Sequence, residues 1–401
     1  MFKMKILSNE YLANLPKDFR VAPGGPAHFA HAFSDFIIKQ KHEWIGVIHQ
    51  GNHTGKTSVL KKDHAGRKTF YLFSYPHLHR SSFMNSKKRI DPRVWFGPQI
   101  KSLQLLIRRV KPDALFLNGF SVFAWQLLEA ARLEKLPIVI QHAGISQVEF
   151  EQYKHLYTKA ARMSVLEMER DIVDAASKQV FLNAFSRDAF CERVRQVPVK
   201  QAVIIPLPYQ KLFTRVVSSK KIERASSSKV IIGCVARWDR IKNHGALVRI
   251  AEEAKKQGLD WYFRSVTRIP ESSVHLRLKK AYRSLIEVVA PMQPKDLINF
   301  YNSVDLLVLP SNFDVSPTVV MEAALQKKAT LISPNVGWVS EYNACGMKDW
   351  VVDFSDAENV VRRIKKLLKK PLPSRFRNQV RNKHNPAKVF ATYLKLINSV
   401  I

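Results

Sequence analysis

Short apolar runs alternate with longer amphipathic segments through the first half of the chain. Apolar runs of this length predict buried strands, and apolar residues at three- and four-residue spacing predict helices. The predicted strands are 4–8, 44–50, 114–119, 137–142, 179–183 and 202–207. The predicted helices are 27–39, 99–110, 121–133 and 165–176. Because strands separated by helices form parallel βαβ units, residues 1–215 are expected to form a Rossmann-like domain.

The alternation of apolar runs and amphipathic segments resumes after residues 216–228. These residues, VVSSKKIERASSS, are rich in serine and charged side chains and lack periodicity. Such a segment is typical of an interdomain linker. A second βα series covers 229–385, and 386–401 is expected to be a closing helix. The second series includes the predicted strands 229–237, 261–266, 306–309 and 330–333, and the predicted helices 245–256, 295–302 and 318–326. The expected fold class is α/β, with two doubly wound domains.

The composition is that of a globular protein. A chain of 401 residues, 46% of them hydrophobic, can bury two cores. No apolar run has the length of a membrane span, and the first residues lack the apolar core of a signal peptide. The three cysteines, Cys191, Cys234 and Cys345, have no metal-ligand spacing and are expected to be buried in a reducing cytoplasm.

Charge changes this picture, because Lys and Arg total 65 against 33 Asp and Glu, a formal net charge of +32. Residues 54–110 carry 13 Lys and Arg but only two acids, and no acid follows Glu358. Such basic regions favour polyanions, either nucleic acid or the anionic cytoplasmic leaflet of a membrane. The chain has no arginine-rich or aromatic-interleaved motif typical of nucleic-acid binding, which favours the membrane. Basic faces that only solubilise the protein remain the alternative.

The most specific pattern lies between residues 306 and 341. The apolar run 306–309 ends at Pro310, and Ser316 then offers an N-cap and Pro317 an N1 residue for the helix 318–326. Asp314 therefore falls in the loop after a strand, and Glu322 falls within the helix. Ligands of open α/β sheets bind at the carboxyl ends of strands, so both acids are expected at a ligand site.

This pattern resembles the donor-binding signature of the group 1 retaining glycosyltransferases, in which an acid and a glutamate are separated by seven residues. The matching residues are Pro310, Ser311, Asp314, Pro317, Glu322 and Ala323. The resemblance implies the GT-B fold, with two facing Rossmann-like domains and a cleft between them. It places the acceptor with residues 1–215 and the nucleotide-sugar donor with 229–385. The chain departs from the family in having Asp rather than Glu at 314 and Lys327 where a glycine is expected.

Two cations follow the predicted strand 229–237 at the spacing that the family uses. Arg237 and Lys242 would lie on the loop that opens the first helix of the second domain. A nucleotide sugar carries a diphosphate, and charge develops on its β-phosphate as the sugar leaves. An arginine fork and a lysine ammonium both stabilise that charge, which makes them catalytic as well as donor-binding candidates.

Other candidates come from the first half of the chain. Gly24 and Gly25 follow the first strand and resemble the family's glycine-rich turn, where backbone N–H groups can approach a phosphate or sugar. His142 ends the predicted strand 137–142, and the resemblance implies that it lies near the donor sugar as a catalytic residue. No histidine pair has metal-ligand spacing and no Asp-x-Asp motif is present, so metal-independent chemistry without a cofactor is expected.

The resemblance implies a role for each acid. Asp314 would bind hydroxyls of the transferred sugar and favour its developing oxocarbenium charge, as a catalytic residue, and Glu322 would bind the ribose. Ser316, Pro317 and Thr318 would complete the donor site, whereas Glu341 is either a weaker candidate or a surface acid. The expected enzyme is a hexosyltransferase that moves sugar from a nucleoside diphosphate to a glycan or lipid-linked acceptor, in cell-surface polysaccharide or lipopolysaccharide synthesis. It would be cytoplasmic, or peripheral on the inner face of the plasma membrane.

Two alternatives remain open from the sequence. The strand 261–266 leads into Thr-Arg-Ile-Pro where the family has glycines, and this loss, with the high charge, fits a non-catalytic polyanion-binding protein on a degenerate transferase scaffold. A glycosidase using Asp314 and Glu322 as its carboxylate pair would leave the cations at 237 and 242 without a role.

Overall fold

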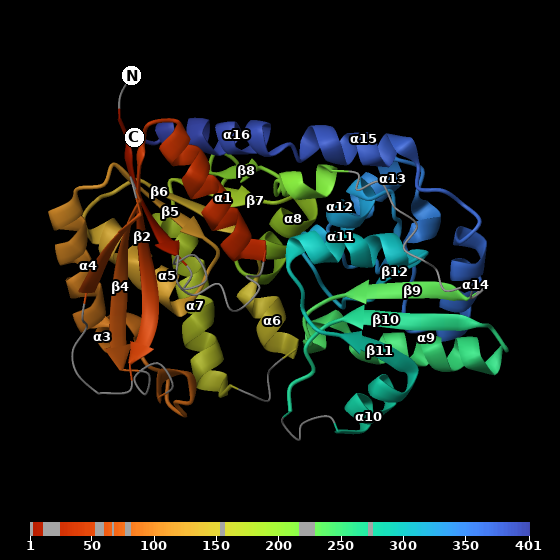
Figure 1. Cartoon of the computed structure of the whole chain (residues 1–401). Helices are drawn as coiled ribbons and strands as arrows, with labels where there is room; N and C mark the ends of the chain where they lie inside the picture. Colours follow the sequence, from red (N-terminus) through yellow and green to blue (C-terminus); the bar gives the residue numbers. More distant parts are fainter. Residues whose placement is uncertain are drawn as a thin grey trace. The chain divides into compact units, whose positions relative to one another are not determined.

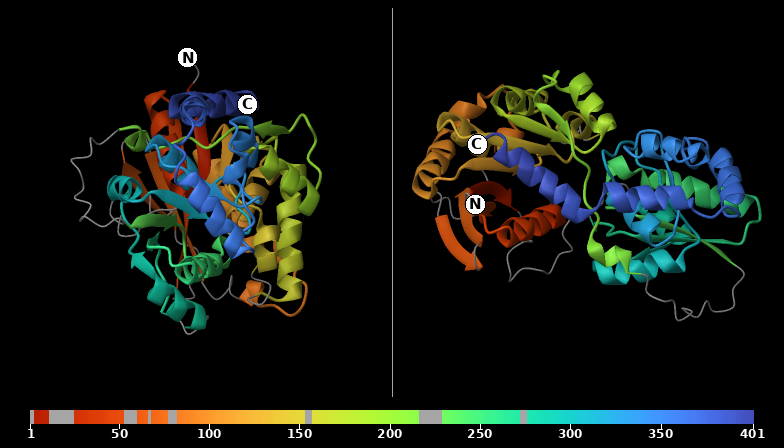
Figure 2. Two further views of the ribbon diagram at one scale, coloured as in Figure 1. Left: turned by 90° about the vertical axis from the view of Figure 1, so that its right-hand side faces the viewer. Right: turned by 90° about the horizontal axis from the view of Figure 1, so that it is seen from above.

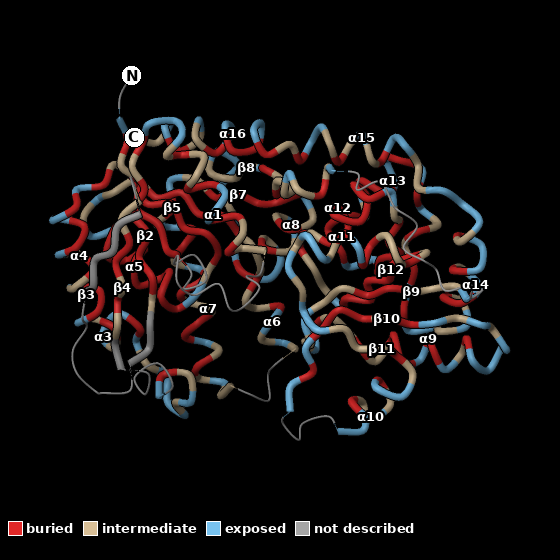
Figure 3. Tube along the Cα trace, viewed as in Figure 1, coloured by how far each residue is buried: buried red, intermediate tan, exposed pale blue. Residues whose placement is uncertain are grey.

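The structure is a computed structural model, and it describes residues 3–10, 25–52, 60–65, 68–76, 82–152, 157–215, 229–271 and 276–401. The chain divides into two compact units, which Figure 1 shows with their elements labelled. The first unit contains Met1–Leu207 together with Ala387–Ile401, and the second contains Pro208–Pro386. Each unit has a sheet of its own, and Figure 3 shows that buried residues concentrate in the strands.

The first unit is built on a sheet of eight strands in the order β3-β4-β2-β1-β5-β6-β7-β8. All neighbouring strands are parallel except β3 and β4, so the predicted parallel α/β architecture is confirmed. The antiparallel β3–β4 pair lies in the basic region and was not predicted from the sequence. The strands are β1 (Lys5–Glu10), β2 (Glu43–Asn52), β3 (Leu60–Ala65), β4 (Lys68–Pro76), β5 (Ala114–Asn118), β6 (Ile138–His142), β7 (Lys178–Phe181) and β8 (Ala202–Ile204).

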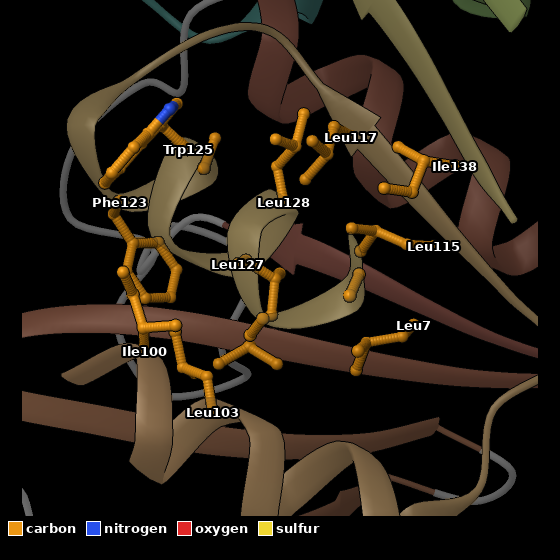
Figure 4. Packing of buried hydrophobic residues seen from close by; sticks show 14 of the residues in the cluster. Leu7, Ile100, Leu103, Leu115, Leu117, Phe123, Trp125, Leu127, Leu128 and Ile138 are labelled. Atoms are coloured by element: carbon orange, nitrogen blue, oxygen red, sulfur yellow. The ribbon is translucent and has the colours of Figure 1, made fainter. Parts of the chain in front are cut away.

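Helices pack on this sheet through their apolar sides. The helices are α1 (Gly25–Lys39), α3 (Pro92–Trp95), α4 (Gly97–Val110), α5 (Val122–Leu133), α6 (Ser146–Gln152), α7 (Lys159–Ala175), α8 (Ala184–Arg193) and α16 (Pro386–Asn398). Side chains of α4, α5 and α7 form one buried cluster with strands β1, β2, β4, β5 and β6. Figure 4 shows part of it, with Leu103 of α4 and Leu127 of α5 beside Leu7 and Leu115 of the sheet.

Aromatic rings join the closing helix to the first unit. Phe33 of α1 lies 5.2 Å from Phe116 of β5 and 5.5 Å from Phe390 of α16, measured between ring centroids. Tyr393 of α16 lies 5.2 Å from Phe29 of α1. Figures 1 and 2 show α16 beside α1, although nearly the whole chain separates them in sequence. The helix expected over 386–401 is therefore present as α16 and completes the core of the first unit.

The second unit has a fully parallel sheet in the order β11-β10-β9-β12-β13. The chain adds β10 and β11 on one side of β9 and then returns to add β12 and β13 on the other side. The strands are β9 (Val230–Val235), β10 (Trp261–Val266), β11 (Ile286–Val289), β12 (Leu306–Leu309) and β13 (Thr330–Ile332). The direction of winding thus reverses between β9 and β12, the place where open α/β sheets bind ligands.

The second unit also contains the α-helices α9 (His244–Lys256), α10 (Leu276–Leu285), α11 (Pro294–Ser303), α12 (Thr318–Leu325), α13 (Val339–Ala344), α14 (Ala357–Leu367) and α15 (Ser374–Lys383). Its short 3-10 helices are η2 (Lys211–Thr214), η3 (Arg240–Lys242) and η4 (Lys348–Trp350). None of the helices in the described part of the chain is long and apolar enough to cross a bilayer.

The boundary between the units falls between Leu207 and Pro208, whereas the sequence placed the end of the first domain at residue 215. The difference has a packing cause, because η2 is held by the second unit. The carbonyl of Phe213 accepts a hydrogen bond of 2.6 Å from Gln326 Nε2, and the Phe213 ring lies 6.1 Å from Tyr301. The predicted linker 216–228 lies outside the described residues.

Helix α12 begins at Thr318 as predicted, but its N-cap differs by one residue from the prediction. Its N-cap is Pro317, with extended backbone angles, and not Ser316. No side chain caps the helix, and Ser316 is buried in the preceding turn. Proline fits the position because its fixed φ matches the value of −65° found there.

Lysine occupies an unusual set of backbone positions. Lys41, Lys111, Lys135 and Lys327 all have positive φ, between 47° and 68°, and each follows or ends a helix. Glycine is normally preferred there because a Cβ in the left-handed region meets the following carbonyl oxygen. Lys327, at φ 61°, stands where the family resemblance led us to expect glycine. The backbone at residue 327 therefore has the left-handed conformation that glycine favours, although the residue is lysine.

We expect Lys327→Gly to stabilise the protein by about 0.5–1 kcal/mol. The left-handed conformation costs a side chain about 1–2 kcal/mol, which exceeds the added chain entropy of glycine, about 0.5–1 kcal/mol. Urea unfolding of the full chain would measure the change. Lys280→Gly is the matched control, because Lys280 is exposed inside α10 and the same substitution should destabilise there. Equal losses of stability in both variants would contradict the prediction.

Candidate functional site

The candidate site is formed by loops that follow β9 and β12, the two strands between which the winding reverses. Residues 236–243 follow β9 and residues 310–317 follow β12. The two loops are joined directly, because the backbone N–H of Asn312 donates a hydrogen bond of 2.7 Å to the carbonyl of Ile241. The topology of the sheet therefore brings together residues that lie more than seventy positions apart in sequence.

An ion pair joins the two loops at this point. The ammonium of Lys242, in η3, contacts Oδ2 of Asp314, and both side chains are largely buried, 15% and 13% exposed. Asp314 is also fixed by its backbone, since its N–H donates to Asn335 at 3.0 Å and its carbonyl accepts from Gly337 at 2.9 Å. The structure thus brings together two residues that the sequence proposed for the same site.

Arg237 lies on the same loop but is mostly exposed. Its side chain is 72% exposed, and Nη2 lies 3.2 Å from Oδ2 of Asp239. The other oxygen of Asp239 accepts a hydrogen bond of 3.1 Å from the backbone N–H of Ile241, which makes Asp239 the N-cap of η3. An exposed guanidinium held at one end can still receive an anionic ligand.

A buried histidine fixes the backbone of the loop. His244 Nε2 lies 2.7 Å from the carbonyl oxygen of Arg237, and its Nδ1 lies 3.2 Å from the hydroxyl of Tyr282. Because a carbonyl only accepts, Nε2 carries the proton and Nδ1 accepts from the tyrosine. Burial lowers the pKa of His244, which favours this neutral form. The ring of Trp238 stacks on the imidazole, with centroids 4.6 Å apart.

The loop needs one left-handed residue to enter α9. Asn243 has φ 51° and ψ 49°, and asparagine is among the residues that tolerate this conformation best. Its N–H donates to the carbonyl of Arg240 at 3.1 Å, which closes the 3-10 turn carrying Lys242.

Glu322 has a different setting from Asp314. Its carboxylate is buried in the first turns of α12, where Oε2 accepts a hydrogen bond of 2.7 Å from the hydroxyl of Tyr301 in α11. Burial raises the pKa of Glu322, and hydrogen bonds from Tyr301 and Thr318 oppose that rise. The predicted contact of Glu322 with a ribose stays a prediction.

Glu341 is not the surface acid that the sequence allowed. Its side chain is buried in α13, Oε1 is paired with Lys383, and Oε2 accepts from the hydroxyl of Ser340 at 2.8 Å. Burial opposes ionisation of Glu341, but the hydrogen bond and charge of Lys383 lower its pKa overall. The contacts of Glu341 are those of an internal ion pair between α13 and α15.

Two candidates belong to the first unit. His142 ends β6 and is buried, with its ring 4.7 Å from Phe181 and 4.4 Å from Phe190. Burial lowers the pKa of His142 to about 4, although a hydrogen bond with Gln179 opposes the shift. It packs there as a neutral ring, and its predicted role on a sugar hydroxyl stays a prediction. Gly25 begins α1, and Gly24 lies outside the described residues.

The residues that sequence reasoning missed are those that hold Arg237 and the backbone of the loop after β9. Asp239 and Trp238 stand between Arg237 and Lys242 in sequence, and His244 follows directly after the αL residue at 243. An acid between two proposed phosphate-binding cations was a signal that could have been used. The partners Asn312 and Tyr282 lie too far along the chain for any local pattern to reveal them.

A metal requires a cluster of suitable side chains. Across the described ranges, no group of three or more His, Cys, Asp or Glu residues is placed to hold a metal ion. Metal-independent chemistry remains an expectation from the sequence.

Comparison with known proteins gives the family of this site. The family model "Glycosyl transferases group 1" matches residues 218–383, which include both loops. No curated protein matches the sequence.

Solved structures are similar over the whole length. Sucrose-phosphate synthase from Thermosynechococcus elongatus has 15% identity and a TM-score of 0.76, with 99% of each chain covered. A UDP-forming alpha,alpha-trehalose-phosphate synthase from Burkholderia xenovorans, solved with glucose-6-phosphate, has 14% identity and a TM-score of 0.72, covering 99% of this chain and 100% of that one. A trehalose-6-phosphate structure from E. coli bound with UDP-2-fluoro glucose has 12% identity and a TM-score of 0.69, with 99% of each chain covered.

At these identities the likeness to solved structures establishes the fold, which is GT-B, and the family model matches the part of the chain that carries both loops. The glycosyltransferase predicted from the acids at 314 and 322 is confirmed at the level of family. Residues 218–383 match the group 1 glycosyl transferases, and the whole chain has the GT-B fold of the similar solved structures.

Proposed function

We propose that this glycosyltransferase binds the diphosphate of a nucleotide sugar at the loops after β9 and β12, with Lys242 and Arg237 as the phosphate-binding cations. The observation that carries the proposal is the Lys242–Asp314 ion pair at the reversal of the second sheet. It supports the proposal because the cation assigned to the leaving group and the acid assigned to the sugar are in contact.

The chemistry follows from these two charges. The bond between the anomeric carbon and the β-phosphate oxygen breaks, and its electron pair stays with the phosphate. Lys242 and Arg237 stabilise the charge that develops on the phosphate, and Asp314 stabilises the positive charge that develops on the sugar. The acceptor oxygen forms the new bond to the anomeric carbon, and its proton passes to the departing diphosphate. The anomeric configuration is retained, as the group 1 resemblance implies.

The donor and acceptor are proposed from chemistry shared with the similar structures. One of those proteins is UDP-forming and was solved with glucose-6-phosphate, and another structure contains UDP-2-fluoro glucose. A uridine diphosphate sugar is therefore the donor to test first. A net charge of +32 favours an acceptor that carries phosphate, such as a sugar phosphate or a lipid-linked diphosphate glycan of cell-surface polysaccharide or lipopolysaccharide synthesis.

A lipid-linked acceptor requires a surface that meets the membrane, and helix α4 offers one. Lys101, Leu105, Arg108 and Arg109 are exposed on it, and Leu105 is 58% exposed. Val94 of the neighbouring helix α3 is 77% exposed. Basic residues around exposed apolar side chains suit the anionic headgroup region of the inner leaflet. We propose that the enzyme is cytoplasmic and peripheral at this surface.

Lys242→Ala should weaken binding of uridine diphosphate at least tenfold, because the buried cation at the reversal of the sheet is lost. Isothermal calorimetry on the full chain would measure the dissociation constant, after a thermal-shift screen of uridine, guanosine and adenosine diphosphates. Lys366→Ala is the matched control, since Lys366 is paired with Asp349 at 3.1 Å away from both loops. Unchanged affinity in the Lys242 variant, or salt-sensitive nucleic-acid binding with no nucleotide binding in the wild type, would contradict the proposal.

Asp314→Asn should bind uridine diphosphate about threefold to tenfold more tightly while losing most of its turnover. Without ligand, the Asp314 carboxylate occupies the Lys242 ammonium, so an entering phosphate must compete with it. Removal of that charge frees the cation but leaves the developing charge on the sugar without its partner. Calorimetry and steady-state kinetics separate the two effects. Weaker nucleotide binding in this variant would show that Asp314 acts otherwise, and Asp349→Asn serves as the control.

Leu105→Asp should reduce binding to anionic liposomes at least fivefold, because it places a charge in the apolar part of the proposed membrane surface. Flotation with vesicles of phosphatidylglycerol and phosphatidylcholine, compared with phosphatidylcholine alone, would measure it. Leu276→Asp is the matched control, since Leu276 is 62% exposed on α10 of the other unit. Equal binding of the wild type to both vesicle types would remove the membrane proposal.

A further inference from the structure

One carboxylate of the second unit contacts Arg237 and caps the turn that carries Lys242, the two proposed phosphate-binding cations. Asp239 lies between Arg237 and Lys242 in sequence, and its two oxygens have separate partners. Oδ2 lies 3.2 Å from Nη2 of Arg237, and Oδ1 accepts from the backbone N–H of Ile241 at 3.1 Å. The side chain of Asp239 is only 14% exposed, so it offers a fixed anchor for a guanidinium that is itself mostly exposed.

Asp239 is also the N-cap of the turn that carries Lys242. The turn η3 contains only Arg240–Lys242, and it is closed by hydrogen bonds from the N–H groups of Lys242 and Asn243 to the carbonyls of Asp239 and Arg240. Asparagine accepts the same backbone hydrogen bond as aspartate and caps helical turns about as well. The substitution Asp239→Asn therefore keeps the cap of the turn and removes the ion pair with Arg237.

The path of the loop does not depend on the Arg237–Asp239 contact. The carbonyl of Arg237 is held by His244, which is itself held by Tyr282 and stacked on Trp238. The carbonyl of Ile241 is held by the N–H of Asn312. Loss of the ion pair therefore releases the Arg237 side chain while the backbone around it stays fixed.

The charge of Asp239 by itself opposes a diphosphate. A carboxylate close to the ligand repels its phosphates and offsets part of the attraction of the cations. An arginine side chain with several free rotamers also loses entropy when it binds phosphate, and an anchored one loses less. Asp239 can favour donor binding only by holding Arg237 in the orientation that receives the phosphate.

We propose that Asp239 is a positioning residue for the donor, one that orients the Arg237 guanidinium toward the diphosphate while capping the turn that presents Lys242. The proposal rests on the proposed function of the same loops. It assigns to an acid, in an otherwise cationic segment, a role in recognising an anionic ligand.

A double-mutant cycle tests this role with uridine diphosphate as the probe. The four proteins are the wild type, Asp239→Asn, Arg237→Ala and the double variant, each as the full chain. Calorimetry gives the dissociation constants, and thermal unfolding shows whether each variant stays folded. Direct repulsion and capping act in both backgrounds, so they cancel in the cycle, and only the effect transmitted through Arg237 remains.

We expect Asp239→Asn to weaken binding at least threefold more in the wild-type background than in the Arg237→Ala background. Equal effects in the two backgrounds would overturn the positioning role. If Arg237→Ala and Lys242→Ala both leave binding unchanged, the proposed donor site itself fails, and the two failures are thus distinguishable. The pair Lys229–Asp260, 3.4 Å apart in the same unit, gives a control cycle in which no coupling to the nucleotide is expected.

Discussion

The contact between Lys242 and Asp314 is the interaction on which the site depends, and it exists because the second sheet reverses its winding between β9 and β12. Adjacent parallel strands bring their following loops to one edge of the sheet, and a crevice opens there where the strand order reverses. At the reversal, the helices after the two strands lie on opposite faces, and the loops are left to meet. The hydrogen bond from Asn312 to Ile241 then fixes the distance between them. An ammonium and a carboxylate can be held largely buried there because each neutralises the other.

Local sequence was enough to predict the elements that carry this contact, but not the contacts that hold them. The strand 306–309 was predicted with its observed bounds as β12, and the helix at 318 to within one residue, because an apolar run, a proline and apolar spacing are local signals. His244 and Asn312 were missed because their partners, Tyr282 and Ile241, come from distant segments. The partners of Asp239 are local, and only its place between the two cations could have indicated them. The β3–β4 pair was missed for a different reason. The two strands pair antiparallel with no helix between them, whereas the prediction relied on strands separated by helices.

Burial separates the predicted site residues into two groups. Lys242, Asp314 and Arg237 retain some exposure at the edge of the sheet, whereas Glu322 and His142 are buried and hydrogen-bond to internal partners, Tyr301 and Gln179 respectively. The pattern of an acid and a glutamate eight positions later cannot show which of the two is buried. Helical spacing indicates which residues share a face of the helix, but not how deeply that face lies in the core. Depth depends on which helix packs outside, and for Glu322 that helix is α11, which supplies the tyrosine.

The aspartate at 314, one methylene shorter than the glutamate typical of the family, fits the way its backbone is held. Its N–H donates to the carbonyl of Asn335 and its carbonyl accepts from the N–H of Gly337, both after β13. These hydrogen bonds keep the Cα of Asp314 from moving toward Lys242. A short side chain on a fixed backbone has few rotamers, and it places its charge with little entropy to lose. The side chain of Lys242 is long and flexible, so in the proposed function its ammonium turns from the carboxylate to the phosphate without movement of the backbone. The division of roles between a rigid acid and a flexible cation suits a site that must accept an anion and then release it.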